Sequence, residues 1–405
     1  MNTPILLDTT GRRLYTQADQ LRAAGPAVRV EMPMGLVGWS VTRGDVARRL
    51  LTDRRVSKDA RRSWPGYQPG RYPWLAAWVD VTSMLTSDGA DHTRLRSFIG
   101  RAFSRDRINA LRPRIETIVA DLLNALDHDT NRVVDLRSAF SYPIPTRVIC
   151  DLVGVPDEQR PAMLKVIDAV LDTSATPEQQ AQTADGMYAA MTTLIDTKRA
   201  ELGEDLTSVL LSAQAEDGDQ LSEDELVSTL ILMIGAGSET AVSLINHSVA
   251  SLLTHLDQLN TVQRHGRWDD VIDEALRLHP PIMHLPLRYA TEDIDLGDGT
   301  VIRRGDLILI SYGAHGRDPS VHRDPDHFDI DRANTDNLAF GHGIHYCLGA
   351  PLARLEARIA LQQLFARFPG LELASDPGEL ERRPSFIGND FHELPVRLQR
   401  ARPAN

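Results

Sequence analysis

Ten consecutive residues near the C-terminal end of the chain decide its fold: Phe340-Gly341-His342-Gly343-Ile344-His345-Tyr346-Cys347-Leu348-Gly349. The three glycines in this stretch let the backbone turn tightly and approach a flat group closely. Pro351 follows in what we predict to be the first turn of a long helix, so Cys347 lies just ahead of a helix N-terminus. Free N–H groups and the positive end of the helix dipole favour a thiolate at such a position.

A thiolate held in a glycine-rich loop is a suitable axial ligand for haem iron. Two other kinds of site use the same residue types. His342, His345 and Cys347 could form a metal site, although crowding into six loop residues suits tetrahedral zinc poorly. A cysteine nucleophile with a histidine base is the second alternative. A lone cysteine is more often a small core residue, which is our prediction for Cys150, but the glycines and the helix start favour a ligand role for Cys347.

The composition limits what the rest of the chain can be. Its 405 residues are 42% hydrophobic and 25% charged, which is ordinary for a soluble globular protein. With two cysteines, the chain holds neither a disulfide framework nor a four-cysteine zinc site. A net charge of −12 argues against a general nucleic-acid-binding protein.

The sequence shows no targeting segment, no membrane span and no nucleotide-binding motif. Residues 1–14 have no continuous apolar stretch after a basic start, so they do not form a signal peptide. The longest strongly apolar run, 230–237, is far shorter than the ~20 residues of a membrane span. We therefore expect a cytoplasmic protein with no membrane and no nucleic-acid partner. There is no Walker-type loop and no complete dinucleotide fingerprint, so the chain carries no nicotinamide or flavin module of its own.

Helical periodicity dominates the organisation of the chain. Apolar residues recur at three- and four-residue spacing through 108–126 and 350–368, and 226–253 is apolar almost all round, which predicts an interior helix. Short β-rich segments occur at 28–31 and 39–42, and 301–311 is typical of a hairpin. We find no repeat and no linker. The pattern predicts one mainly α domain with minor β structure, spanning residues 1–405.

One loop segment is rich in aromatic residues. Residues 64–78 hold three of the five tryptophans, two tyrosines and several Pro or Gly breakers. Such a segment either packs on a small core of its own or forms a lid over a hydrophobic ligand.

The ten-residue stretch resembles the haem-binding signature F-G-x-G-x-H-x-C-x-G of the cytochrome P450 family. Further landmarks follow in the family's order from His92 to Gly349. The segments 56–60 and 284–289 are similar to those of soluble bacterial members from actinomycetes. The resemblance implies the P450 fold, a triangular helical haem domain with a small β-rich region, and haem b as the cofactor. It implies Cys347 as the axial ligand of the iron.

The resemblance also implies how the haem is held. Its two propionates need cationic partners where they are buried. His92 and Arg96, which lie four apart on one helix face, match the family's propionate-binding pair, and Arg288 and His345 match the remaining partners. The other residues expected against the cofactor are Ala236, Gly237, Phe340, Gly341 and Gly349.

Two polar residues interrupt the interior helix, Glu239 and Thr240. The resemblance implies that Gly237 makes room for dioxygen and bends the helix, while Glu239 and Thr240 relay protons. Without the resemblance, Thr240 would bond back to a preceding carbonyl and Glu239 would reach a water-filled gap. Ala241 stands where the family often has a second threonine, which leaves Thr240 as the hydroxyl at this point.

Glu274 and Arg277 lie three apart on one helix face. Alone, this spacing suggests no more than an exposed ion pair. The resemblance implies a buried structural network that Arg332 joins.

The resemblance implies a haem-thiolate monooxygenase that hydroxylates a hydrophobic molecule, such as a steroid, a macrolide or another polyketide. Its electrons would come from NAD(P)H through a ferredoxin reductase and an acidic ferredoxin. The ferredoxin would dock on the arginine-rich segment 92–114 and near Arg354 or Arg358. Alternatives are a haem-binding sensor or carrier, or an oxidative coupling or desaturation enzyme. The expected substrate contacts are Met84, Ile234, Ile282, Met283, His284, Leu285, Phe386 and Ile387.

Overall fold

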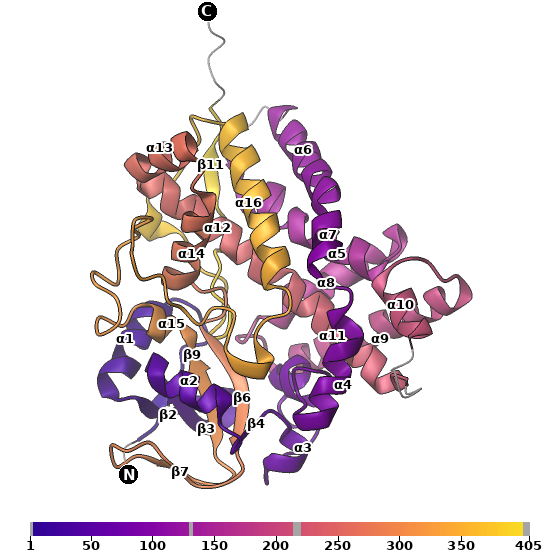
Figure 1. Ribbon diagram of the computed structural model, residues 1–405, viewed down its shortest axis with the longest axis vertical. Helices are drawn as coiled ribbons and strands as arrows, with labels where there is room; N and C mark the ends of the chain where they lie inside the picture. The colour runs from indigo at the N-terminus through magenta and orange to yellow at the C-terminus, as the bar shows by residue number, and fades with distance from the viewer. Residues whose placement is uncertain (1–2, 129–132, 214–219, 400–405) are drawn as a thin grey trace, which may run out of the picture.

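The computed structural model describes residues 3–128, 133–213 and 220–399. A six-stranded mixed sheet lies at one corner of the molecule, beside a larger helical region (Figure 1). Its strand order is β1-β2-β3-β9-β6-β4, with the β1–β2 and β3–β9 pairs parallel and the others antiparallel. The strands are β1 (Ile5–Leu6), β2 (Ala27–Met32), β3 (Leu36–Val41), β4 (Val56–Ser57), β6 (His284–Ala290) and β9 (Leu307–Ser311).

The segment 301–311 does not form the predicted hairpin. β8 (Val301–Ile302) pairs with β7 (Ile294–Asp295) in a separate two-stranded sheet, whereas β9 joins the large sheet between β3 and β6. Between β8 and β9 the chain turns at Gly305, whose φ is +87°. This turn sends the two strands into different sheets, so the hairpin prediction is wrong. A third sheet has the order β10-β11-β5, formed by β5 (Val133–Asp135), β10 (Glu372–Leu373) and β11 (Pro395–Arg397).

Helices make up most of the described chain, so the prediction of a mainly α fold with minor β structure is confirmed. They are α1 (Leu14–Ala24), α2 (Gly44–Thr52), α3 (Ala60–Ser63), α4 (Gly89–Gly100), α5 (Arg105–Ala110), α6 (Arg112–His128), α7 (Pro143–Val153), α8 (Arg160–Val170), α9 (Pro177–Ala200), α10 (Leu206–Ser212), α11 (Glu223–Gly237), α12 (Glu239–Thr254), α13 (Leu256–His265), α14 (Trp268–Leu278), α15 (Tyr312–Gly316) and α16 (Ala350–Arg367).

The predicted interior helix is divided into α11 and α12. A capping box between Ser222 and Glu225 begins α11. The two helices meet at Ser238, whose backbone is not helical (φ −103°, ψ −83°) and whose hydroxyl donates to the Ile234 carbonyl. Taken together, Glu223–Thr254 is long and apolar enough to cross a membrane, but 72% of its apolar window is buried inside the structure. These residues are therefore the core of the fold.

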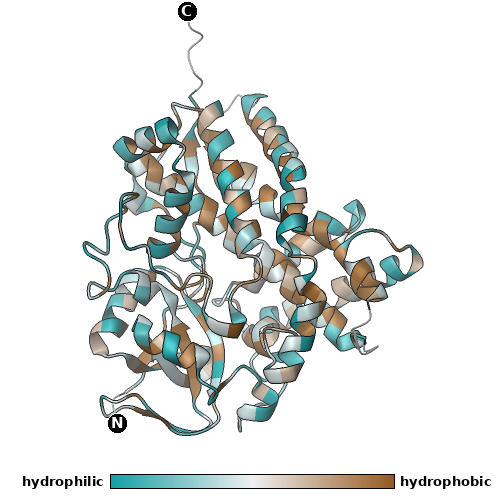
Figure 2. Ribbon diagram, viewed as in Figure 1, coloured by the Kyte–Doolittle hydropathy of each residue, from teal (hydrophilic) through white to brown (hydrophobic). Residues whose placement is uncertain are grey.

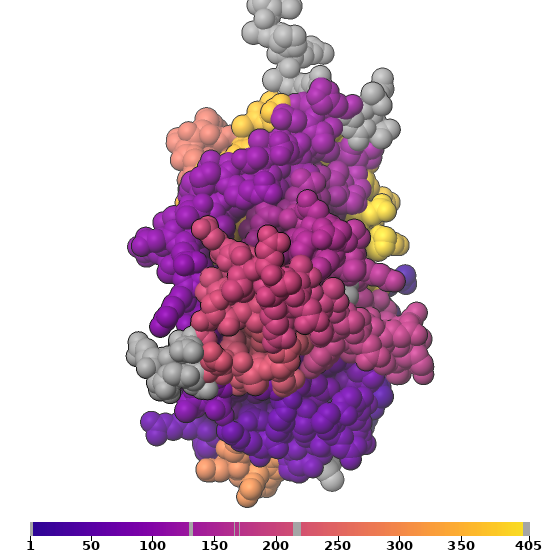
Figure 3. Space-filling model, turned by 90° about the vertical axis from the view of Figure 1, so that its right-hand side faces the viewer, coloured from indigo at the N-terminus to yellow at the C-terminus, as the bar shows by residue number. Residues whose placement is uncertain are grey.

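The main core lies where the long helices meet. Apolar side chains of α6, α7, α11, α12, α14 and α16 form one cluster, and the strands of the large sheet pack in others. In Figure 2 the hydrophobic residues gather along β3 and β9 at the centre of that sheet. On the face shown in Figure 3, α9 and α10 cover the middle of the molecule. α9 contacts both α11 and the short helix Pro73–Leu75, so it connects the helical core to the aromatic segment.

Candidate functional site

A large cavity separates the Cys347 loop from the junction of α11 and α12. The empty space inside it, part of which is open to solvent, is ≈ 1470 Å³.

 Most of the residues that line the cavity are apolar, which suits an apolar ligand. One wall is the loop that contains Phe340, Gly341, His345, Cys347 and Gly349, and the opposite wall includes Ala236, Gly237 and Thr240.

The Cys347 loop takes its shape from two glycines and one backbone hydrogen bond. Gly341 and Gly343 have φ values of +75° and +74°, in the left-handed region that favours glycine. A Cβ on Gly343 would lie 2.8 Å from the Leu51 carbonyl oxygen, so this position also needs the small residue for packing against α2. The Cys347 N–H donates to the Phe340 carbonyl at 2.9 Å and closes the loop.

Cys347 lies ahead of α16, as the sequence predicts, and its side chain lines the cavity. The Cys347 side chain is exposed to the cavity, but the protein around it still desolvates the thiol and raises its pKa. The backbone N–H groups of Gly349 and Ala350 and the Arg96 guanidinium act in the opposite direction. The N–H groups at the start of α16 thus stabilise the thiolate, but their effect on the pKa is smaller than that of desolvation. A metal ion bound to the sulfur would complete the deprotonation. Within residues 3–128, 133–213 and 220–399, no three His, Cys, Asp or Glu side chains are grouped to hold a metal ion, which disfavours the zinc alternative.

The four residues expected to bind propionates lie close to this loop. The rings of His92 and His345 are 4.5 Å apart between centroids, and the Nε2 atom of each is buried without a hydrogen-bond partner in the described structure. Arg288 is buried and forms no ion pair with any described residue. Arg96 donates to the Tyr346 carbonyl at 2.9 Å. Buried donors without acceptors are costly, and the carboxylates of a haem would satisfy them. The residues present therefore fit this cofactor.

Thr240 and Gly237 both line the cavity. The Thr240 hydroxyl donates to the Ala236 carbonyl at 2.8 Å, which leaves its lone pairs available to a group in the cavity. A Cβ on Gly237 would lie 2.9 Å from Cδ1 of Ile149, so the missing side chain makes room for α7 as well as for a ligand.

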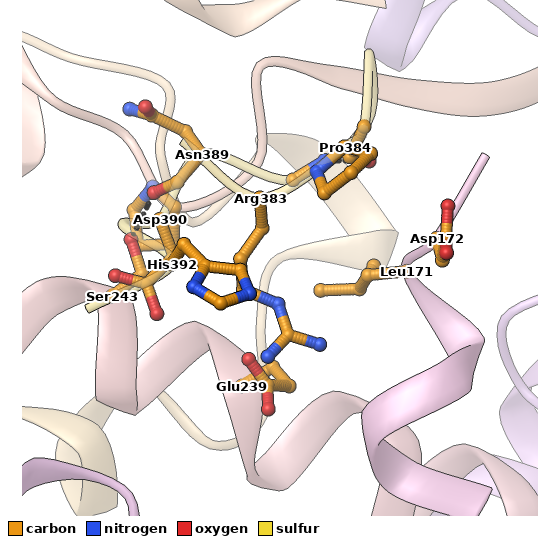
Figure 4. A pocket seen from close by; sticks show the side chains of 12 residues that line it. Leu171, Asp172, Glu239, Ser243, Arg383, Pro384, Asn389, Asp390 and His392 are labelled. Atoms are coloured by element: carbon orange, nitrogen blue, oxygen red, sulfur yellow. Dashed lines mark hydrogen bonds between the residues drawn. The ribbon is translucent and has the colours of Figure 1, made fainter. Parts of the chain in front are cut away.

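Glu239 lies elsewhere. Its carboxylate accepts hydrogen bonds from Arg137 at 2.8 and 3.1 Å, and Arg137 also binds Asp390 at 2.9 Å. The Glu239 side chain opens onto a second cavity of ≈ 790 Å³. In this cavity the Arg383 guanidinium points towards the Glu239 carboxylate (Figure 4). Burial raises the pKa of Glu239, against the opposing charges of Arg383 and Arg137. The structure therefore does not bring Glu239 and Thr240 to the same cavity.

The expected substrate contacts are only partly brought together. Met84, Ile282 and Leu285 line the large cavity. The other five are buried without lining it: Ile234, Met283, His284, Phe386 and Ile387. In β6, alternate side chains point to opposite faces of the sheet, which turns His284 away from the cavity that Leu285 faces.

Sequence reasoning missed several residues of the cavity, and two of them, Trp78 and Glu356, bear on its chemistry. Trp78 lines it, and its membership of the aromatic segment 64–78 was the available signal. In the same segment, Trp64 stacks on Tyr72 and Tyr289, so the segment both packs on the sheet and reaches the cavity. Glu356 of α16 also lines the cavity, and burial raises its pKa to about 8.

The structural network forms as the resemblance implies. Arg277 binds Glu274 at 2.7 Å, and Arg332 binds the same carboxylate at 3.0 Å. Both members of the first pair are fully buried. Arg277 also donates to the carbonyls of Gly316, Pro325 and His327, so the network fixes the segment that leads to the Cys347 loop.

Comparisons with known proteins agree with this geometry. Residues 268–386 match the family model "Cytochrome P450". The chain is 41% identical over 403 residues to 2-hydroxy-5-methyl-1-naphthoate 7-hydroxylase from Streptomyces carzinostaticus, which covers 98% of each chain. The structure of CYP154A1 from Streptomyces coelicolor A3(2) superposes with a TM-score of 0.93 at 44% identity, covering 98% of this chain and 100% of that one. Testosterone-bound CYP154C4 from Streptomyces sp. ATCC 11861 has a TM-score of 0.93 at 40% identity, covering 99% of both chains.

Such identity over almost the whole length, together with the fold, settles the family and the class of chemistry. Members of this family bind haem b with a thiolate-ligated iron, and the relatives are hydroxylases or monooxygenases. The chain belongs to the cytochrome P450 family and is a haem b-dependent monooxygenase.

Proposed function

We propose that this monooxygenase, with residues 1–405 acting as one haem domain, hydroxylates an apolar molecule with several rings. The observation that carries the proposal is the large cavity, which has Cys347 on one wall and Thr240 on the other. Between them lie mostly apolar side chains, including Met84, Ile282 and Leu285. Such a lining binds its ligand through burial of apolar surface.

Cys347 holds the iron in this proposal, and His92, Arg96, Arg288 and His345 hold the propionates. When bound, the haem supplies the activation of dioxygen. The protein's own contribution is to position the substrate, to exclude water and to hold a proton near the reacting atoms. Phe340 and Leu348 close the cavity beside Cys347, and Ala236 and Gly237 leave space on the opposite wall.

Thr240 is the residue that holds a proton at the cavity. Its Oγ1 is fixed by the bond to Ala236, so a hydroxyl is already in place when dioxygen and substrate arrive. Glu239 takes part in the relay only if its side chain leaves Arg137, because in the described arrangement its oxygens are bound there. Glu239 then carries protons from the second cavity towards Thr240.

Electrons reach the haem from a ferredoxin, which is reduced by an NAD(P)H-dependent reductase. The surface beside Cys347 supports this part of the proposal. Ile344 and Tyr346 are 57% and 46% exposed. Arg96 contacts the Tyr346 carbonyl, and further along the same segment Arg101, Arg105 and Arg107 are exposed on and just before α5. An acidic ferredoxin is attracted by such a surface. Arg354 and Arg358 contribute less than the sequence suggests, because they form ion pairs with Asp273 and Asp269. The cytoplasm is where NAD(P)H keeps this electron supply reduced.

The substrate class rests on the cavity and on the relatives. The naphthoate hydroxylase and the testosterone-bound structure both concern fused-ring compounds, and a steroid, a macrolide or another polyketide fits the same apolar lining. Trp78 adds a large flat surface at the edge of the cavity, suited to stacking on a ring.

One experiment tests the function as a whole. The purified holoenzyme is screened against steroids, macrolides and aromatic polyketides for a shift of the Soret band to the high-spin form, and products formed with ferredoxin, reductase and NAD(P)H are identified by mass spectrometry. We expect a product heavier by one oxygen atom. A product that has lost two hydrogens, or two coupled substrate molecules, would identify a desaturase or coupling enzyme. Binding without product or NAD(P)H consumption would identify a sensor or carrier.

A further inference from the structure

Lys58 is a buried cation with few partners. It directly follows β4, which pairs with β6 beside Arg288: Ser57 faces Tyr289 in the register. The lysine is only 2% exposed. Its Nζ donates a hydrogen bond to the Pro286 carbonyl at 3.2 Å, and no carboxylate in the described part of the chain forms an ion pair with it. A buried ammonium with a neutral acceptor alone is unfavourable unless an anion completes its surroundings.

The Asp88 carboxylate acts on the Lys58 charge but is largely engaged by other donors. Asp88 precedes α4 and accepts hydrogen bonds from the Ser57 hydroxyl and from the backbone N–H groups of Lys58 and Asp59. Its other oxygen lies 3.7 Å from Nε2 of His345. Burial opposes ionisation of Asp88, but the donors around it hold its pKa below the usual range. Asp88 is therefore a fixed negative charge that connects the Lys58 segment to the Cys347 loop.

The charges in this region do not balance. Lys58, Arg96 and Arg288 would supply three positive charges, and Asp88 supplies one negative charge. Without a further anion, burial and the neighbouring Arg288 lower the pKa of Lys58 far below its usual value, although Asp88 acts in the opposite direction. Two further negative charges would balance the set, which is the charge of the two ionised propionates of a haem.

The choice of lysine at this position is also unusual for the chain. Lysine occurs three times among 44 basic residues, at Lys58, Lys165 and Lys198. Lys198 pairs with Asp205 at 2.8 Å, and Lys165 is exposed on α8. Lys58 is thus the lysine whose burial has no ion pair among the described residues to explain it. A lysine is a compact charge that needs fewer donors satisfied than the fork of an arginine.

We propose that Lys58 is a cofactor-binding residue of this enzyme, which supplies positive charge to the haem propionates together with Arg96 and Arg288. The proposal rests on the haem site described above. It adds the segment directly after β4 to those that hold the cofactor and gives the buried lysine a reason to be charged in the holoenzyme.

The test compares three holoenzymes with the unaltered enzyme. Lys58→Met removes the charge and keeps the length, Lys58→Arg keeps the charge, and Lys165→Met removes an exposed lysine as the control. The midpoint potential of the ferric/ferrous couple is measured by redox titration, and the loss of haem is measured by transfer to excess apomyoglobin. Loss of a nearby positive charge stabilises the ferric form.

We expect Lys58→Met to lower the midpoint potential and to lose haem about tenfold faster. Lys58→Arg should stay close to the unaltered enzyme in potential, and Lys165→Met should match it in both measurements. If Lys58→Met only loosened the fold, haem would be lost faster, but the midpoint potential would not depend on whether residue 58 is charged. If Lys58→Met yields no holoenzyme, Lys58→Gln, which retains a donor for Pro286, takes its place.

An unchanged potential and an unchanged rate of haem loss in Lys58→Met would overturn the proposal. The carbon monoxide difference spectrum distinguishes a failure of the haem-site proposal from a failure of the role proposed for Lys58. If the unaltered reduced enzyme lacks the thiolate Soret band, the haem-site proposal fails. If that band is present in both enzymes and Lys58→Met behaves like the unaltered one, only the role of Lys58 fails.

Discussion

Glu239 and Thr240 are consecutive residues at the start of α12, but their side chains open onto different cavities. Thr240 lines the cavity that Cys347 also lines, whereas Glu239 is bound by Arg137 beside the second cavity. The non-helical backbone at Ser238 lies immediately before them. Proton transfer between the two sides therefore depends on a side-chain movement of Glu239, while the hydroxyl of Thr240 is already in place.

Replacing Thr240 by alanine should uncouple the enzyme. Without the hydroxyl, no proton is held near the reacting atoms, so we expect product formed per NAD(P)H consumed to fall on the order of 10- to 100-fold, with hydrogen peroxide released instead. Thr240→Ser should retain most of the coupling. Thr254→Ala is the matched control, because Thr254 makes the same bond to the carbonyl four residues earlier but lies outside the cavity. Full coupling in Thr240→Ala would contradict this role.

Arg137 holds two buried carboxylates, and its removal should destabilise the fold. Arg137→Gln leaves Glu239 and Asp390 without their cation, so we expect the free energy of unfolding to drop by about 3–5 kcal/mol. The exposed pair of Arg303 and Asp293 provides the control, since Arg303→Gln should cost no more than about 1 kcal/mol. Urea denaturation of both holoenzymes measures the difference.

The loss in Arg137→Gln should also depend on pH. Burial already raises the pKa of Glu239, and removing Arg137 takes away one of the two charges that oppose this rise. A carboxyl group with a raised pKa binds its proton more tightly in the folded state, so stability is gained as the pH falls. We therefore expect a smaller deficit at mildly acidic pH than at mildly alkaline pH. A deficit that is equal at both would show that lost packing, not buried charge, causes it.

The Cys347 loop was the most predictable part of the site, because its chemistry lies in ten consecutive residues. The positive φ values of Gly341 and Gly343 and the start of α16 follow from residue types alone. The pocket-facing residues were less predictable. α11 is apolar almost all round, so the sequence cannot show which of its apolar residues face the cavity. In the structure Met233 lines the cavity, whereas the expected Ile234 does not.

Buried charge was the other feature that sequence patterns did not show. Lys58 directly follows a short strand and Glu356 lies in a long helix, and at both places a charged residue normally predicts exposure. Their burial depends on segments distant in sequence, such as β6 beside Lys58. The pair of Glu239 and Arg137 is of the same kind, since 102 residues separate its members.

The two cysteines should behave differently in the holoenzyme. Cys347→Ala removes the group proposed to bind the iron, so we expect the thiolate Soret band of the reduced carbon monoxide complex to disappear. Cys150 is buried in α7, and burial raises its pKa to about 11, so Cys150→Ala should leave the band in place. The reverse result would refute the assignment of the ligand.

The enzyme should lose stability in acid through two stacked histidines. The rings of His247 and His279 lie 4.7 Å apart, and both are buried. Burial lowers the pKa of each far below its usual value, and nearby arginines lower it further. Below about pH 6.5 the unfolded chain takes up protons that the fold excludes, so stability falls by up to about 1.4 kcal/mol per pH unit for each group. Urea denaturation across this range measures the slope, which should flatten in His247→Gln but not in the exposed control His265→Gln.

Two glycines of the signature allow the last test, because they share a backbone conformation and differ in their surroundings. A Cβ on Gly341 would have its nearest neighbour at 3.7 Å, whereas a Cβ on Gly343 would lie 2.8 Å from the Leu51 carbonyl oxygen. Gly341→Ala therefore costs the left-handed backbone penalty of about 1–2 kcal/mol, and Gly343→Ala adds a clash with backbone that does not move freely. We expect haem content and thermal stability of the holoenzyme to fall more in Gly343→Ala. Equal losses would mean that α2 yields to the added methyl group, and that backbone conformation alone accounts for both glycines.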